Sequence, residues 1–385
     1  MKIGFAARWS PLDKGSWSGT CHYAYNELIK DAEVYIYTYK WPWRIREWLT
    51  MQKSFYKRIR KQHTSVEFLK DYAKYFSRQL EKDLEKRPVD ILFVCASPQL
   101  ISYINTRIPI VLMTDATFKQ IQEYYPYFSN LSKRNVRQGI ELDKKAFLKA
   151  SHCLLTSDWC KRSAINDYGV SEESISVTNL GANLENVPSQ NELSFDKNGT
   201  CRLLFLGVEW ERKGGNIAVE TFRLLKKEGI NVHLQIIGCT PPDDLSTDNN
   251  ISIIPFLDKN NSSDLNKLHK ILLDTDFLLL PSRAECAGVV FSEASAYGIP
   301  SITTDTGGIS SVVENGINGY TLPPDAVPEE YAVLIRNIYS DDESFFRLRK
   351  SSRAHYDSHM TWQRWHDRFF QIAKSILNKP VPLPL

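Results

Sequence analysis

The chain has 385 residues, enough for two domains of ordinary size, and its 42% hydrophobic and 12% aromatic content is typical of a soluble globular protein. The 48 Lys and Arg residues against 45 Asp and Glu give a net charge of +3, so no overall basicity predicts nucleic-acid binding. The seven cysteines are scattered and contain no Cys-x-x-Cys pair, which argues against a zinc site and for a reducing compartment.

Residues 1–185 alternate apolar runs with helix-like segments, which predicts an open, mostly parallel α/β sheet. The expected strands are 2–7, 33–38, 89–95, 108–113, 152–156 and 174–178. The first apolar run is too short for a signal-peptide core, and no run of about eighteen apolar residues occurs. We therefore expect a cytoplasmic protein.

Two loops that follow these strands are candidate ligand sites. The loop 14–20 contains Gly19 and opens a helix at about Cys21, where a backbone can approach a phosphate closely. It lacks the G-x-G-x-x-G and P-loop spacings, which disfavours an NAD-dependent dehydrogenase. Asp115 follows the strand 108–113, and its carboxylate is either a ligand contact or the N-cap of the next segment.

The segment 40–61 is basic and aromatic, with eight Lys or Arg residues and one acid, Glu47. Two interpretations stay open. The segment is either a solvated helix whose aromatic residues pack on the first domain, or an element that lies on an anionic membrane surface. The second interpretation would place the protein peripherally at the inner membrane surface, near a lipid-linked acceptor.

A second alternation of strands and helices follows a polar stretch, residues 186–200, which we interpret as an interdomain linker. The expected strands are 202–206, 232–237, 251–254, 277–280 and 300–304. After the first of these, Arg212 and Lys213 open a helix, where two cations are unfavourable for the helix dipole. They are either a solvated pair or ligands of a phosphate.

The stretch 281–308 carries two glutamates, Glu285 on a loop and Glu293 inside a short helix that Gly288 and Val289 open. Glu293 lies on an apolar face, where an ionised carboxylate must be paired or hydrogen-bonded. It is either a structural residue or an acceptor of hydrogen bonds from ligand hydroxyls. The free N–H groups at the start of the helix form a ready phosphate site. The sequence Asp274-Thr275-Asp276 ends a helix before a strand, so we expect no metal site there.

The spacing Glu285-x7-Glu293, with Pro-Ser before it and Glu-Ala-x-Ala-x-Gly-x-Pro at its end, resembles the signature of retaining glycosyltransferases of family 4. The resemblance implies the GT-B fold, two Rossmann-like domains that face each other across a cleft. It also implies that Glu285 faces the transferred sugar and that Glu293 binds the nucleotide ribose. Cys286-Ala287 stand where the family often has Gly-Phe, a departure next to the donor sugar.

The resemblance also assigns the donor diphosphate to Lys213 and, as a substitute, to Arg212, because the family's arginine position falls on Val208. By the same resemblance, Gly19 faces the diphosphate and Gly288 and Val289 hold it at the helix start. Asp115 aligns the acceptor, so the implied catalytic residues are Glu285, Asp115 and Lys213.

The predicted organisation is an acceptor-binding domain 1–185, a linker 186–200, a nucleotide-sugar domain 201–360, a helix 361–378 that returns to the first domain, and a tail 379–385. The implied activity is retaining, metal-independent transfer of a hexose, with a UDP-hexose the expected donor and no further cofactor. The expected acceptor is a hydroxyl of a glycan or glycolipid. The alternative is a GT-B module that binds a nucleotide sugar without turnover.

Overall fold

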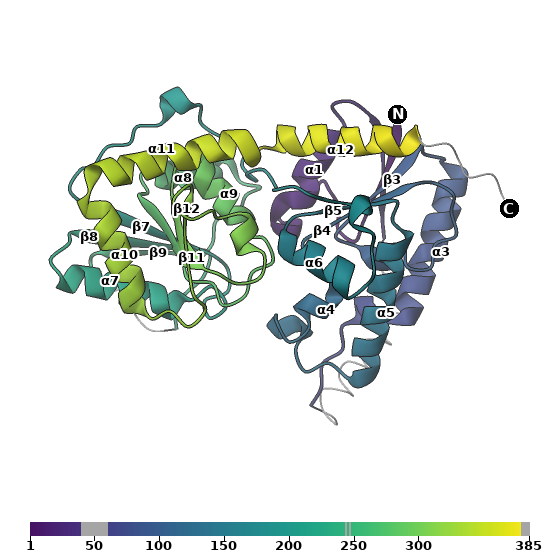
Figure 1. Ribbon diagram of the computed structural model, residues 1–385, viewed down its shortest axis with the longest axis horizontal. Coiled ribbons are helices and arrows are strands. Elements are labelled where there is room, and N and C mark those ends of the chain that lie inside the picture. The colour runs from purple at the N-terminus through teal and green to yellow at the C-terminus, as the bar shows by residue number, and fades with distance from the viewer. Residues whose placement is uncertain (40–60, 243–244, 246–247, 379–385) are drawn as a thin grey trace. The chain divides into compact units, whose positions relative to one another are not determined.

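Figure 1 shows the protein as a computed structural model that describes residues 1–39, 61–242, 245 and 248–378. Predictions for residues 40–60 and for the tail 379–385 lie outside the described residues. The chain divides into two compact units, Met1–Thr178 with Gln363–Leu385, and Asn179–Trp362.

The N-terminal unit is built on a six-stranded parallel sheet in the order β2-β1-β3-β4-β5-β6. Its strands are β1 (Lys2–Ala7), β2 (Glu33–Thr38), β3 (Ile91–Cys95), β4 (Ile110–Thr114), β5 (His152–Leu155) and β6 (Ile175–Val177). All residues of β3 and β4 are buried, as expected of inner strands of a parallel sheet. The helices of this unit are α1 (Thr20–Leu28), α3 (Lys70–Lys86), α4 (Phe118–Ile121), α5 (Lys133–Lys149) and α6 (Asp158–Asn166).

The C-terminal unit repeats this design, with a parallel sheet in the order β12-β11-β10-β7-β8-β9. Its strands are β7 (Cys201–Leu206), β8 (Val232–Ile237), β9 (Ile251–Ile254), β10 (Phe277–Leu280), β11 (Ser301–Thr304) and β12 (Gly319–Leu322). Its helices are α7 (Gly215–Lys227), α8 (Ser262–Leu273), α9 (Val289–Ala296), α10 (Pro328–Ser340) and α11 (Asp342–His359). The two Rossmann-like sheets confirm the predicted fold class.

The last helix, α12 (Trp362–Leu377), returns to the N-terminal unit, as predicted. The ring of Trp365, which has no exposed surface, lies 5.6 Å from the ring of Phe93 on β3, and Phe369 lies 5.3 Å from the same ring. The apolar stripe of this helix is therefore part of the core of the N-terminal unit.

The stretch 186–200 packs on the C-terminal unit. The backbone oxygen of Pro188 accepts a hydrogen bond from Arg353 Nη1 at 2.6 Å, and that of Asn186 accepts one from the Tyr297 hydroxyl at 3.3 Å. The side chains of Val187 and Leu193 pack against the core of this unit. The boundary between the compact units lies earlier, between residues 178 and 179.

Within the described part of the chain, no helix combines the length and the apolar character that crossing a bilayer requires.

Candidate functional site

The order of strands in the C-terminal sheet brings two loops together. β7 lies between β8 and β10, so the chain reverses its direction of winding between β7 and β10. Ligands of open α/β sheets bind at such a switch point, outside the carboxyl ends of the strands. The loop after β7 carries Arg212 and Lys213, and the loop after β10 carries Glu285. The topology therefore explains why these predicted site residues meet.

The two loops are in direct backbone contact. The N–H of Arg283 donates a hydrogen bond to the carbonyl oxygen of Arg212 at 2.8 Å. Gly214 has a φ of +76°, and a Cβ atom at this position would lie 1.9 Å from the carbonyl oxygen of Pro281. A side chain at position 214 would therefore push the two loops apart.

Four charged side chains form an ion-pair cluster at this contact. Lys213 Nζ contacts Glu285 Oε2, and Arg212 Nη1 lies 3.3 Å from the same oxygen. Arg212 Nη1 also donates to the carbonyl oxygen of Ala284 at 2.8 Å, and its Nε donates to Glu209 Oε2 at 2.5 Å. Arg212 therefore lies beside Lys213 and Glu285, whereas Val208, the position implied for the family's arginine, is 68% exposed.

The cluster keeps Glu285 ionised inside the protein. Burial acts to raise the pKa of Glu285, but the charges of Lys213 and then Arg212 outweigh it and hold this pKa below its usual value. An ionised carboxylate can accept hydrogen bonds only, which is the property needed to bind sugar hydroxyls. The neighbouring cations can attract a diphosphate, but in this structure they are already engaged with carboxylates.

The start of α9 lies directly after Glu285. Gly288, the residue before the helix, has a φ of +66°, and a Cβ atom there would lie 2.6 Å from the ring of Phe291 and 3.1 Å from Cγ of Glu285. A glycine is therefore required for the close approach of the loop to the helix. Val289, the first residue of α9, presents its backbone N–H at the positive end of the helix dipole.

Glu293 lies on the second turn of α9 and is 2% exposed. Its Oε1 accepts a hydrogen bond from Lys259 Nζ at 2.5 Å, and Lys259 lies on the loop before α8. Among the residues that the structure describes, no donor contacts Glu293 Oε2. The second oxygen of this buried carboxylate therefore keeps its capacity to accept hydrogen bonds from a ligand.

The remaining predicted residues, Gly19 and Asp115, belong to the N-terminal unit. Gly19 precedes α1 and has a φ of +88°. Asp115 is half-buried directly after β4, at the carboxyl edge of the sheet. The N-cap of the next helix is Thr117, whose side chain accepts a hydrogen bond from the N–H of Gln120, so the capping role considered for Asp115 is taken by another residue.

Sequence reasoning missed Lys259, because its contact with Glu293 depends on tertiary packing. It also missed Glu209, although Glu209 lies only three positions before its partner Arg212. The stretch Asp274-Thr275-Asp276 lies between the end of α8 and the start of β10, as predicted. Asp276 has no exposed surface and pairs with Arg202 at 3.0 Å and Arg349 at 3.2 Å, so it serves the core of the unit.

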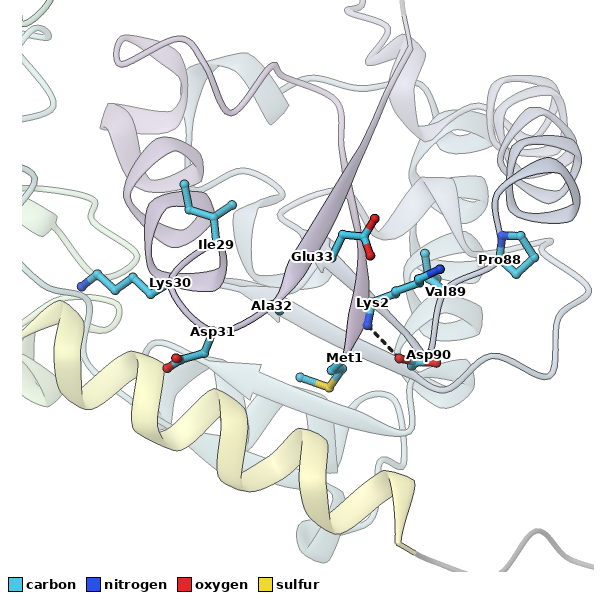
Figure 2. Close-up of a pocket in the computed structure, with 10 residues that line it drawn as sticks. All are labelled: Met1, Lys2, Ile29, Lys30, Asp31, Ala32, Glu33, Pro88, Val89 and Asp90. Carbon is cyan, nitrogen blue, oxygen red and sulfur yellow. Dashed lines mark hydrogen bonds between the residues drawn. The ribbon is translucent and has the colours of Figure 1, made fainter.

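Figure 2 shows a cavity of about 790 Å³ at the other, amino-terminal edge of the N-terminal sheet. Its lining residues come from the starts of β1 and β2 and the turn before β3, and include Lys2, Glu33 and Asp90. The N–H of Lys2 donates to Asp90 Oδ2 at 2.7 Å, shown as a dashed line. Because open α/β sheets bind ligands at the carboxyl edge, we place the candidate site there and not in this cavity.

Comparison with known proteins covers both the fold and the C-terminal unit. The structure superimposes on a glycosyltransferase from Rickettsia africae with a TM-score of 0.68, over 98% of this chain and 99% of that one, at 17% sequence identity. It also superimposes on Anabaena HepE in complex with UDP and glucose, with a TM-score of 0.65 over 97% and 100% of the two chains, at 16% identity. At these identities the likeness concerns the fold.

Sequence similarity to curated proteins is partial. The chain is 23% identical to the amylovoran biosynthesis glycosyltransferase AmsK of Erwinia amylovora, over 54% of this chain and 53% of that protein. The chain thus spans about half the length of this relative, and only 22% of a spore coat protein of Bacillus subtilis that it also matches. Residues 200–341 match the family model described as glycosyl transferases group 1. The protein therefore has the fold of GT-B glycosyltransferases, and the match to the group 1 family model falls within its C-terminal unit.

Proposed function

We propose that the protein is a glycosyltransferase that moves a hexose from a nucleotide diphosphate sugar to a hydroxyl of a glycan or glycolipid. The observation that carries this proposal is the meeting of Lys213, Arg212 and Glu285 at the switch point of the C-terminal sheet. Two cations beside the start of a helix suit a diphosphate, and a buried ionised carboxylate suits sugar hydroxyls.

Each residue has a proposed role. Lys213, Arg212 and the backbone at Gly288 and Val289 hold the diphosphate and neutralise the charge that develops on it as the sugar leaves. Glu285 accepts hydrogen bonds from the hydroxyls of the transferred sugar, which competes with its present contact to Lys213. A diphosphate that takes over Lys213 therefore also releases Glu285 for the sugar.

Glu293 binds the ribose hydroxyls through its available oxygen. The proposed reaction retains the configuration at the anomeric carbon. The acceptor oxygen forms the new bond on the face from which the diphosphate departs, and the leaving phosphate oxygen takes the acceptor proton. Two roles concern the N-terminal unit, where Gly19 is proposed to contact the diphosphate and Asp115 to align the acceptor. We propose that neither a metal ion nor a further cofactor takes part.

The proposed donor is a UDP-hexose, because HepE, which shares the fold, has been crystallised with UDP and glucose. The proposed acceptor is lipid-linked if residues 40–61 contact an anionic membrane, and a soluble glycan otherwise.

A donor panel tests the proposal. Thermal denaturation is measured with UDP-glucose, UDP-galactose, UDP-N-acetylglucosamine and GDP-mannose. A ligand at about 100 times its dissociation constant stabilises the folded state by roughly 2.7 kcal/mol. Release of the nucleotide from the stabilising donor is then followed with and without glycan and glycolipid acceptors. Stabilisation by none of the four donors would contradict the proposal. Stabilisation by a donor without acceptor-dependent release of its nucleotide would favour the alternative, a GT-B module that binds a nucleotide sugar without turnover.

A further inference from the structure

We propose that Lys259 is a positioning residue of the nucleotide site, which orients the carboxylate of Glu293 so that its second oxygen is presented to the ribose hydroxyls. This inference rests on the function proposed above. It concerns a residue outside the Glu-x7-Glu signature, on a loop that no sequence pattern marks as functional.

The geometry around Lys259 supports a fixed position. Its Nζ donates to Glu293 Oε1 at 2.5 Å and to the backbone oxygen of Asn183 at 3.4 Å. Asn183 has no exposed surface, and its side-chain oxygen accepts a hydrogen bond from the indole of Trp362 at 3.1 Å. The ammonium group is therefore held between a carboxylate and a carbonyl that is itself part of the packed unit.

The loop that carries Lys259 is also ordered by hydrogen bonds. The N–H of Asp258 donates to Asp264 Oδ2 at 2.9 Å, and the N–H of Asn260 donates to Asp258 Oδ1 at 2.8 Å. The side chain of Asn261 then caps α8. Asp258 is thus tied to the first turn of this helix and Asn260 to Asp258, which reduces the conformational entropy lost when the lysine holds Glu293.

The chemical consequence concerns the charge of Glu293. The side chain of Glu293 is 3% exposed and that of Lys259 is 27% exposed, so the ammonium group supplies the countercharge at the solvent side of a dry carboxylate. Burying a carboxylate without a paired charge is costly, so removal of Lys259 would leave this side chain without its countercharge. Lys259 binds Oε1 and leaves the other oxygen for the ligand.

Among the residues that the structure describes, the two tyrosines that interact electrostatically with Glu293 supply no positive charge. Burial, and after it the charge of Glu293, raises the pKa of Tyr297, and burial raises that of Tyr356 to about 12. Both tyrosines are therefore neutral between pH 6 and pH 9. His269 Nδ1 lies 2.7 Å from the Tyr297 hydroxyl. His269 is unchanged in every variant compared below, so it cannot cause a difference between them.

The test measures how strongly each variant prefers a ribose over a deoxyribose. Dissociation constants are determined by calorimetry for UDP and 2′-deoxy-UDP, and in parallel for GDP and 2′-deoxy-GDP. Removing one hydroxyl that donates to a carboxylate should weaken binding to the wild-type protein by about tenfold or more. The variants are Lys259→Met, the conservative Lys259→Arg, and Lys267→Met as a control, because Lys267 is an exposed lysine on α8.

We expect Lys259→Met to reduce this preference to about twofold, because the second oxygen of Glu293 is no longer held toward the ribose. Lys259→Arg and Lys267→Met should keep the wild-type preference. If Lys259→Met keeps the wild-type preference for the ribose, whether or not it binds UDP and 2′-deoxy-UDP equally less tightly, the proposal is overturned. If the wild-type protein binds neither UDP nor GDP, the proposed function itself fails, and this outcome can be told apart from a failure of the role of Lys259.

Discussion

The substitution Lys213→Met removes one of the two cations that hold the carboxylate of Glu285. Lys213 is 7% exposed and Glu285 is 8% exposed, and loss of one partner from a buried ion pair costs about 3–5 kcal/mol. Arg212 Nη1 remains 3.3 Å from the same carboxylate oxygen. We therefore expect a loss at the lower end, about 3 kcal/mol of unfolding free energy at pH 8.

The size of this loss should depend on pH. Burial acts to raise the pKa of Glu285, but Lys213 and Arg212 hold it below its usual value. A carboxyl whose pKa is lowered by folding stabilises the protein above its unfolded pKa, and this stability is lost as the pH falls through the folded pKa. The difference between the wild-type protein and Lys213→Met should therefore persist from pH 8 to about pH 5 and shrink only as the pH falls below the ordinary carboxyl pKa of about 4.3.

Urea denaturation of the double variant Lys213→Met, Glu285→Gln checks the reasoning. Because this variant leaves no unpaired buried charge, its stability should recover to within about 1 kcal/mol of the wild-type protein. The control is Lys226→Met, which removes an exposed ion pair with Asp248 and should cost less than about 1 kcal/mol. If the losses of unfolding free energy of Lys213→Met and Glu285→Gln simply add in the double variant, the two side chains do not stabilise each other as a buried ion pair.

Three further predictions concern other parts of the chain. Glu293→Gln should weaken nucleotide binding by roughly 1.5–3 kcal/mol, measured by calorimetry, with little change in melting temperature, because the amide oxygen can still accept the hydrogen bond from Lys259; normal binding with early melting would mean that Glu293 is structural. Burial raises the pKa of Asp143 to about 7. Stability from such a carboxyl is present below its unfolded pKa of about 4 and is lost as the pH rises to about 7, above which the carboxyl is ionised in both the folded and the unfolded state. The melting temperature of Asp143→Asn relative to the wild-type protein should therefore rise between about pH 4 and pH 7 and change no further above that; a constant difference across this range would contradict the prediction. The protein should sediment with anionic vesicles at low salt and be released by high salt, and a charge-reversed variant of the segment 40–61 should not sediment; no sedimentation at low salt would favour a soluble acceptor. That variant replaces Lys57, Arg58, Arg60 and Lys61 by Glu.

Most strands could be predicted because inner strands of a parallel sheet are continuous apolar runs. The run 277–280 is fully buried as β10, and the run 2–7 coincides with β1. The edge strand β12 was not predicted, because it begins with Gly319 and its middle residues Tyr320 and Thr321 are only half-buried. A short edge strand needs no apolar run, so its signal in the sequence is weak.

The site could be predicted in its residue types but not in its contacts. The sequence marks Lys213 and Glu285 separately, and their meeting depends on the position of β7 beside β10, which periodicity does not reveal. The partner of Glu293 is 34 positions away in the chain and lies on a loop without a motif. Burial of Glu293 predicted that it needs a partner, and the structure identifies that partner as Lys259.

The C-terminal unit is proposed to bind a nucleotide through its diphosphate, and the difference in affinity between a nucleoside and its diphosphate tests this proposal. Calorimetry compares uridine with UDP, and guanosine with GDP, on the wild-type protein, Lys213→Met and the exposed control Lys226→Met. We expect the diphosphate to bind at least about tenfold more tightly than the nucleoside in the wild-type protein and the control, and this advantage to disappear in Lys213→Met while nucleoside binding is unchanged. Equal losses for nucleoside and diphosphate in Lys213→Met, or no advantage of the diphosphate in the wild-type protein, would contradict the account.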